Sequence, residues 1–305
     1  MYSAWSQKAF TLLELLVVIT IIGVLSSIVV VSMSGGTESA EIAKGKSCAQ
    51  QVHALLGHEL KGEWTFDEGG YGTCSGSYDV CDTSEYGHHG TIYSDGARYV
   101  SSPFGEYALR FDGIDDYVTL GNVMNGFTDF SLTVWASTTQ EETGIAAYAR
   151  PTIIGVVHGS GYTTNDFTLG AYNGNLDWWD EFNVAYQADH NTGYSISDGA
   201  WHFIVASREI SGSNSLIRLY LDGILVGSYT SAGIGAISRS IRVGFGYTGS
   251  EFDGFLDEVR IYSTALDVSA VQKYYAQGLD RFLKSGAIAR EEYIQRIGEL
   301  TALSF

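Results

Sequence analysis

The feature that most constrains this chain is an uncharged, largely aliphatic run close to its N-terminus. Residues 15–37 contain no charged side chain, and Leu15–Met33 has the sequence LLVVITIIGVLSSIVVVSM. A helix of this length would span about 35 Å, which is enough to cross a bilayer core of about 30 Å. The run therefore predicts a membrane-spanning helix, and the rest of the chain is expected to fold outside the bilayer.

The residues that precede the run distinguish it from a cleaved secretory signal. A secretory signal has a shorter apolar core with its cleavage site after that core, whereas here the base and the small residue, Lys8 and Ala9, come first. Glu14 lies at the very edge of the run. A carboxylate at that depth is costly in lipid, so Glu14 is expected to have a partner.

The stretch KAFTLLELLVVITIIGVL, which begins at Lys8, resembles the N-terminal signature of type IV prepilins. The resemblance implies that a prepilin peptidase cuts between Ala9 and Phe10, that the new N-terminus is methylated, and that Glu14 registers the subunit in a filament. The Phe10 amine and Glu14 of different subunits can neutralise each other inside an apolar filament core. This family nearly always has glycine before the cut, and Ala9 keeps only its small size. The alternative is an ordinary signal anchor in which Glu14 is incidental.

The resemblance also implies partners and a location. The partners are other pilin subunits, the prepilin peptidase and the inner membrane before assembly, and the final location is an extracellular filament on the cell surface. The net charge of the chain is −18, yet residues 1–62 hold as many bases as acids, so the excess lies in residues 63–305. An acidic body repels nucleic acid and anionic membrane surfaces, and no nucleic-acid partner is predicted.

The sequence after Gly62 is typical of an all-β structure. The chain is rich in glycine and tyrosine, with 37 and 20 residues, most of them in this part, which alternates apolar and polar residues between turn residues about every ten positions. Phe130, Leu132 and Val134 illustrate the alternation, and Asp222-Gly223 between two such runs predicts a type I′ hairpin. We expect a jelly roll of two packed sheets.

The order of motifs in this body resembles the LamG-like jelly-roll family of the concanavalin A-like superfamily. The matching segments are WTFDEG (64–69), DTSEYGHHGTI (82–92), YALRFDGIDDYVTLG (107–121), FSLTVWAS (130–137), GAWHFIVAS (199–207), IRLYLDGILVGS (217–228) and FDGFLDEVRIYSTALDVSAV (252–271). The fold class is thus predicted to be mainly β, with a long N-terminal pilin helix, a LamG-like sandwich and a short C-terminal helical segment.

Four regions follow from these patterns. They are a prepilin leader at 1–9, a transmembrane and assembly helix at 10–61, the jelly roll at 62–275 and a helical tail at 276–305. Within the last part of the chain, helix is expected over Asp267–Leu303, with a cap at Asp267 and a turn at Ser285-Gly286.

No catalytic constellation stands out in the sequence, so we expect no enzymatic activity. Most acids lie in turn positions, where Asp is favoured by turn chemistry. Calcium is a better candidate than catalysis, because it takes several oxygens from carboxylates and turn carbonyls. The superfamily often holds calcium, and the acids nearest to its motifs are Asp67, Asp112 and Asp257.

The candidate ligand-binding residues are Tyr172, Trp178 and Trp179, which stand among asparagines and aspartates. Aromatic faces stack on sugar rings while amides and carboxylates take the hydroxyls. Adjacent residues of a strand point to opposite faces, so one of the two tryptophans is expected in the core and the other as an exposed platform.

Cysteine spacing predicts a small disulfide. Cys74 and Cys81 close a short loop, CSGSYDVC, in a pattern that fits an oxidising compartment better than a zinc site. Cys48 is left over, as a free thiol or an intermolecular partner. Taken together, the sequence predicts a surface filament subunit whose head mediates adhesion or carbohydrate binding. The alternatives are a purely structural pilin and a membrane-anchored protein that acts on polysaccharide.

Overall fold

The computed structural model describes residues 57–93, 97–141, 150–156, 165–183, 186–245 and 251–302. The predicted leader, the cleavage site at Ala9 and Phe10, Glu14 and Cys48 lie outside these residues. Among the helices that are described, none is both long and apolar enough to span a membrane.

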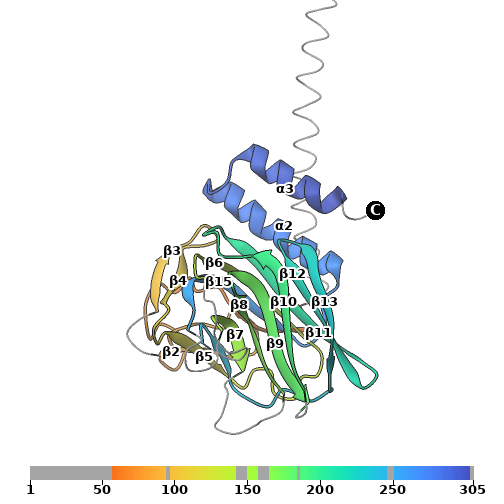
Figure 1. The fold of residues 1–305 in the computed structure, drawn as a ribbon. Helices are drawn as coiled ribbons and strands as arrows, with labels where there is room; N and C mark the ends of the chain where they lie inside the picture. The colour runs from red at the N-terminus through yellow and green to blue at the C-terminus, as the bar shows by residue number, and fades with distance from the viewer. Residues whose placement is uncertain are drawn as a thin grey trace, which may run out of the picture.

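The body is a sandwich of two antiparallel sheets (Figure 1). The larger sheet has the order β13-β12-β11-β6-β15-β4-β3, and β1 also pairs with β15. Its strands are β1 (Leu60–Trp64), β3 (Arg98–Ser101), β4 (Tyr107–Asp112), β6 (Phe130–Thr138), β11 (His202–Ser211), β12 (Asn214–Leu221), β13 (Ile224–Ala232) and β15 (Asp253–Tyr262). The predicted mainly β sandwich is confirmed.

The second sheet has the order β10-β9-β8-β7-β14-β5-β2. Its strands are β2 (Thr91–Tyr93), β5 (Tyr117–Gly121), β7 (Thr152–Val156), β8 (Asp166–Tyr172), β9 (Asn175–Asn183), β10 (Tyr186–Ser195) and β14 (Ile241–Val243). β1 begins at Leu60, so the sandwich starts two residues before the predicted boundary at 62.

The turn between β12 and β13 forms as its sequence predicts. Leu221 pairs with Ile224, which leaves Asp222 and Gly223 as the two loop residues. Both have positive φ, 51° and 82°, as a type I′ turn requires. Asp222 accepts a hydrogen bond from the backbone N–H of Phe203 at 2.9 Å, which ties the turn to β11.

The central part of the larger sheet is buried on both faces. Phe130, Leu132 and Val134 of β6 face the second sheet, in the core between the two sheets. Trp135 of the same strand belongs to a second apolar cluster, together with Phe203 of β11 and residues of the C-terminal helices. All nine residues of β6 are consequently buried.

Two helices, α2 (Val268–Ser285) and α3 (Arg290–Ala302), cover that second face. Figure 1 shows them side by side against one end of the sandwich. α2 begins as predicted, because the Asp267 carboxylate accepts from the backbone N–H of Ala270 at 2.8 Å. It ends at Gly286, whose φ of 77° is left-handed. The helix therefore crosses the predicted boundary at 275.

α2 sits on the sheet through a glycine. A Cβ added at Gly278 would lie 2.2 Å from a ring carbon of Trp135. The Trp135 indole is itself packed among Phe104, Phe203, Tyr275 and Phe282, with ring centroids 4.5, 5.3, 5.7 and 5.2 Å away. Helix and sheet approach this closely only because Gly278 has no side chain.

Candidate functional site

The predicted aromatic platform is absent from the surface of β9. Trp178 and Trp179 are 0% and 1% exposed, so the prediction that one of them is free to stack on a sugar is wrong. Trp178 faces the core between the sheets, stacks on Phe167 at 4.9 Å and donates its ring N–H to Asp180 at 2.7 Å. β9 lies inside its sheet between β8 and β10, and Trp179 is buried on the opposite face.

On that opposite face, next to Trp179, lies a partly buried ion cluster. The Arg150 guanidinium donates to Asp177 of β9, and it donates to both oxygens of Asp189 of β10 at 2.7 and 2.6 Å. It also lies 4.2 Å from the ring centre of Tyr172. One face of the predicted ligand residue Tyr172 is therefore occupied by Arg150. We call Arg150, Asp177 and Asp189 the Arg150 cluster.

The two carboxylates of the Arg150 cluster differ in their electrostatics. Asp177 is 1% exposed, and burial raises its pKa to about 7 although Arg150 opposes the shift. Asp189 is half exposed, and its hydrogen bonds to Arg150 lower its pKa. A single guanidinium thus serves two acids, and the more deeply buried acid keeps its proton more readily. Asp180, in the core, also has a pKa raised by burial, to about 6.

These shifts predict that stability falls as pH rises from 5 to 8. Between the unfolded pKa of about 3.9 and the folded values, the folded protein binds more protons, so it is favoured at the acidic end. His202, whose pKa is raised, acts in the same direction, whereas His190, whose pKa is lowered, opposes it. Asp177→Asn removes the titrating carboxyl, so the loss of unfolding free energy between pH 5 and pH 8 should become smaller by on the order of 2 kcal/mol. Urea unfolding at several pH values checks this, and identical slopes in both proteins would contradict it.

The three acids predicted to hold calcium do not form one group. Asp67 accepts from the backbone N–H groups of Glu106 and Tyr107 at 2.7 and 3.1 Å. Asp257 is buried and accepts from Ser102 and from the N–H of Glu258. Asp112 of β4 lies opposite Asp253 of β15. Asp253 comes four residues before Asp257, so Asp112 and Asp257 are about 13 Å apart along the strand direction. Asp67 and Asp257 thus each accept hydrogen bonds within the head.

Asp112 does lie in an acidic group, with other partners. Carboxylate oxygens of Asp112, Asp115 and Asp116, in the loop between β4 and β5, lie within 4.8 Å of one another. Asp116 is 1% exposed, and one of its oxygens accepts from the Asp112 N–H at 3.0 Å. Burial raises its pKa. This loop offers hard oxygen ligands of the kind calcium takes, and calcium binding stays a prediction.

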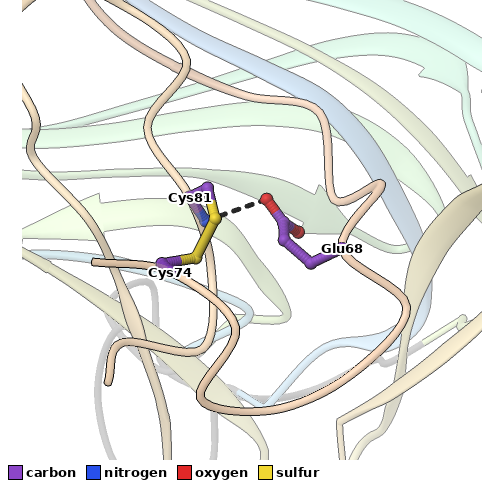
Figure 2. A group of neighbouring side chains, drawn as sticks. All are labelled: Glu68, Cys74 and Cys81. Atoms are coloured by element: carbon purple, nitrogen blue, oxygen red, sulfur yellow. Dashed lines mark hydrogen bonds between the residues drawn. A yellow bond between two sulfur atoms is a disulfide. The ribbon is translucent and has the colours of Figure 1, made fainter. Parts of the chain in front are cut away.

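The predicted cysteine pair forms a disulfide (Figure 2). The Glu68 carboxylate accepts from the backbone N–H of Cys81 at 2.9 Å, and burial raises its pKa. Both sulfurs are used in the bond between Cys74 and Cys81, so neither is a thiolate ligand. Glu68 and the disulfide hold the loop in place.

A groove that the sequence analysis missed lies between the sandwich and the C-terminal helices. One hollow, of about 320 Å³, is bounded by the β12–β13 turn, the start of β11 and helices α2 and α3. A second, of about 370 Å³, lies beside it against α2, α3 and Pro103. Trp201 and Arg296 line both hollows. We call the two hollows together the hairpin groove.

The polar wall of the hairpin groove is centred on a histidine held between two acids. The ring nitrogens of His202 lie 2.7 Å from Asp222 and 3.1 Å from Asp198. Burial lowers the pKa of His202, but the hydrogen bonds to the two carboxylates outweigh it and leave the pKa raised. Arg296 of α3 reaches the groove while paired with Glu292 at 2.6 Å. Residues far apart in the sequence, from Pro103 to Leu300, meet here, and no local sequence pattern could have predicted their proximity.

Comparison with known families matches two separate parts of the chain. Residues 112–272, just over half of the chain, match the concanavalin A-like lectin/glucanases superfamily. The chain belongs to this superfamily. Residues 6–30 match the prokaryotic N-terminal methylation motif, as the resemblance to type IV prepilins predicted. A comparison with curated proteins finds no match.

Solved structures share the superfamily fold at low sequence identity. Domain 4 of AbnA, a GH43 extracellular arabinanase from Geobacillus stearothermophilus solved with arabinotriose, is 20% identical with a TM-score of 0.54, and the match covers 70% of this chain and 97% of that domain. The binding domain of Paraclostridial Mosquitocidal Protein 1 is 16% identical with a TM-score of 0.54, over 72% and 52% of the two chains. The binding domain of botulinum neurotoxin serotype D is 15% identical with a TM-score of 0.53, over 75% and 53%. The chain thus spans about half of the two toxin domains, and the likeness shows the fold.

Proposed function

We propose that this protein is a subunit of a type IV pilus or pseudopilus-like surface filament whose concanavalin A-like head binds carbohydrate. The observation that carries the proposal is the presence in one chain of a methylation motif at 6–30 and a lectin-like sandwich at 112–272. The motif supports membrane insertion followed by assembly, and the sandwich supplies a large head. The head then belongs on the outside of the filament.

The distribution of charge supports this division of labour. The first 62 residues are neutral in sum, and the whole net charge of −18 lies in the remainder. A neutral apolar segment can pack in a filament core, whereas a strongly acidic head stays solvated and is repelled from anionic membrane surfaces. Within the filament, the Phe10 amine of one subunit would neutralise Glu14 of another.

Carbohydrate is the ligand class that the head supports best. The arabinanase domain of like fold was solved with arabinotriose, a neutral sugar chain. The hairpin groove combines aromatic side chains with carboxylates, a histidine and an arginine, which is the composition that sugar sites use. A glycosidase needs one acid with a raised pKa, whereas for Asp198 in the hairpin groove burial raises the pKa but hydrogen bonds outweigh it and leave the pKa lowered, so we propose a binding role and not a hydrolytic one.

Filament assembly can be tested with the full-length chain in a bacterium that carries a prepilin peptidase and a pilus machinery. We expect sheared filaments to contain the wild-type subunit, and mass spectrometry of that subunit should give the mass of a chain that starts at a methylated Phe10. Glu14→Val should be cut normally but should fall at least tenfold in the filament fraction, because it lacks the partner for the Phe10 amine. Glu41→Val, which removes another acid of the N-terminal segment, is the matched control and should assemble.

Two results would contradict the filament proposal. The first is a wild-type chain that keeps residues 1–9 and remains in the membrane. The second is equal incorporation of the wild type and Glu14→Val into filaments.

A further inference from the structure

We infer that the hairpin groove is the carbohydrate site of the head and that it takes a neutral oligosaccharide. The inference deepens the proposed function and rests on it, because it names where on the head the sugar binds. The two hollows, of about 320 and 370 Å³, are each within the size range of small-molecule sites. Since they share Trp201 and Arg296, a ligand longer than one sugar can extend from one to the other.

The apolar part of the groove offers aromatic surface. Trp201 packs edge-on against Phe104 at 5.2 Å and lies 6.3 Å from Phe255, so its indole is held in one orientation. Tyr194, at the end of β10, is 53% exposed at the wall of the hollow of about 320 Å³. Aromatic faces that are fixed or exposed in this way bind the C–H faces of sugar rings without a large loss of side-chain entropy.

The polar part offers fixed donors and acceptors. His202 holds Asp198 and Asp222 in place through its two ring nitrogens, and each carboxylate keeps further lone pairs for hydroxyl groups. Arg296 is oriented by Glu292 at 2.6 Å and by a hydrogen bond with Tyr275. Paired oxygens and a guanidinium are suited to the neighbouring hydroxyls of a sugar, which present donors and acceptors together.

The charge of the groove selects among sugars. Three carboxylates, Asp198, Asp222 and Glu299, line the hollow of about 320 Å³, against the positive charges of Arg296 and of His202 when it is protonated. The balance is negative, in a head that is strongly acidic overall. A sugar that carries its own carboxylate would be repelled, so a neutral sugar is favoured.

The groove depends on a part of the chain outside the superfamily match. That match ends at residue 272, whereas Arg296, Glu299 and Leu300 come from α3. The site therefore forms only where this sandwich packs against its own C-terminal helices. On β9, by contrast, both tryptophans are buried and Tyr172 is covered on one face by Arg150, so that face offers no comparable surface.

The test is a binding assay with the full-length chain, purified in a detergent without a sugar headgroup. The probes are four neutral trisaccharides (arabinotriose, cellotriose, maltotriose and triacetylchitotriose) and two acidic sugars (sialyllactose and trigalacturonic acid). We expect the wild type to bind at least one neutral probe, and to bind it more tightly than either acidic one. Tyr194→Ala and Arg296→Lys should each weaken that binding at least tenfold. Tyr78→Ala, at the disulfide loop, is the matched control and should stay within twofold.

Trp201→Ala should abolish the binding, but Trp201 packs on Phe104, so Tyr194→Ala and Arg296→Lys, which leave that contact intact, decide the matter. If the wild type binds a neutral sugar and both variants bind it equally well, the groove is not the site, while the carbohydrate function stands. Tighter binding of an acidic sugar overturns the proposed ligand class. No binding of any probe by a folded wild type overturns the carbohydrate function and this inference with it.

Discussion

Replacing Arg150 by alanine is expected to lower the free energy of unfolding by about 3–5 kcal/mol at pH 8. Asp177 is 1% exposed and its Oδ1 has no hydrogen-bond partner among the described residues, so Arg150 supplies its main compensation. Without the guanidinium, Asp177 and Asp189 face each other as like charges, one of them buried. The arginine also contacts the ring of Tyr172, and that packing is lost with it.

The effect of Arg150→Ala should depend on pH. Asp177 already has a pKa of about 7 beside the guanidinium, so at pH 5 the acid can take a proton and escape part of the cost. Urea unfolding of the full-length chain at pH 5 and pH 8 measures both values, and Arg150→Ala combined with Asp177→Asn should recover part of the loss at pH 8.

Arg218→Ala is the matched control for Arg150→Ala. Arg218 pairs with Glu209 at 2.8 Å, but the two side chains are 28% and 48% exposed, and exposed pairs contribute about 0–1 kcal/mol. A loss at Arg150 no larger than the loss at Arg218 would show that the Arg150 cluster does not stabilise the fold. The same would follow from a loss that is equal at pH 5 and pH 8.

The second large effect is expected at Gly278, where α2 rests on Trp135. An alanine there places its Cβ about 2 Å from the indole, which is enclosed by four other aromatic rings and cannot move aside easily. Overpacking of this kind costs about 1–3 kcal/mol, which outweighs the gain in helix propensity of about 1 kcal/mol. We expect Gly278→Ala to destabilise the protein and to increase hydrogen exchange in α2 and α3.

The same change in α3 should have the opposite sign. Gly298 also lies within a helix, but no other side chain comes within 4 Å of a Cβ added there. Gly298→Ala should therefore stabilise the protein by about 0.5–1 kcal/mol. If both alanines stabilised the protein by the same amount, the predicted clash between a Cβ at position 278 and Trp135 would be contradicted.

Much of the fold could be predicted because its signals are local. The alternation of Phe130, Leu132 and Val134 is a property of one strand, and the Asp222-Gly223 turn is a property of two residues. Asp267 caps the start of α2 and Gly286 caps its end, each through contacts within one turn of the helix. Each of these signals depends on a few neighbouring residues, so it can be recognised in the sequence without knowledge of the tertiary structure.

The sites could not be predicted in the same way because they depend on distant partners. The acids and tryptophans of β9 have the composition of an exposed sugar-binding strand, yet Asp177 is buried because Arg150, 27 residues away in the sequence, neutralises it. Asp67, predicted as a calcium ligand, accepts a hydrogen bond from the backbone of Glu106, 39 residues away, which no local pattern indicates. The hairpin groove needs α3 to fold back onto the β12–β13 turn, and Trp201 alone gives no sign of that.

In the filament that we propose, the attachment of β1 would have a mechanical consequence for the head. The backbone that leads into the head passes through β1, which pairs with the second half of β15, between Trp64–Val259 and Leu60–Tyr262. Arg260 adds an ion pair to Glu63 of β1 at 2.7 Å. A pull along β1 loads these bonds in shear, so they must break together, whereas a pull across the strand would open them one after another. The head is therefore built to hold best when tension runs along its first strand.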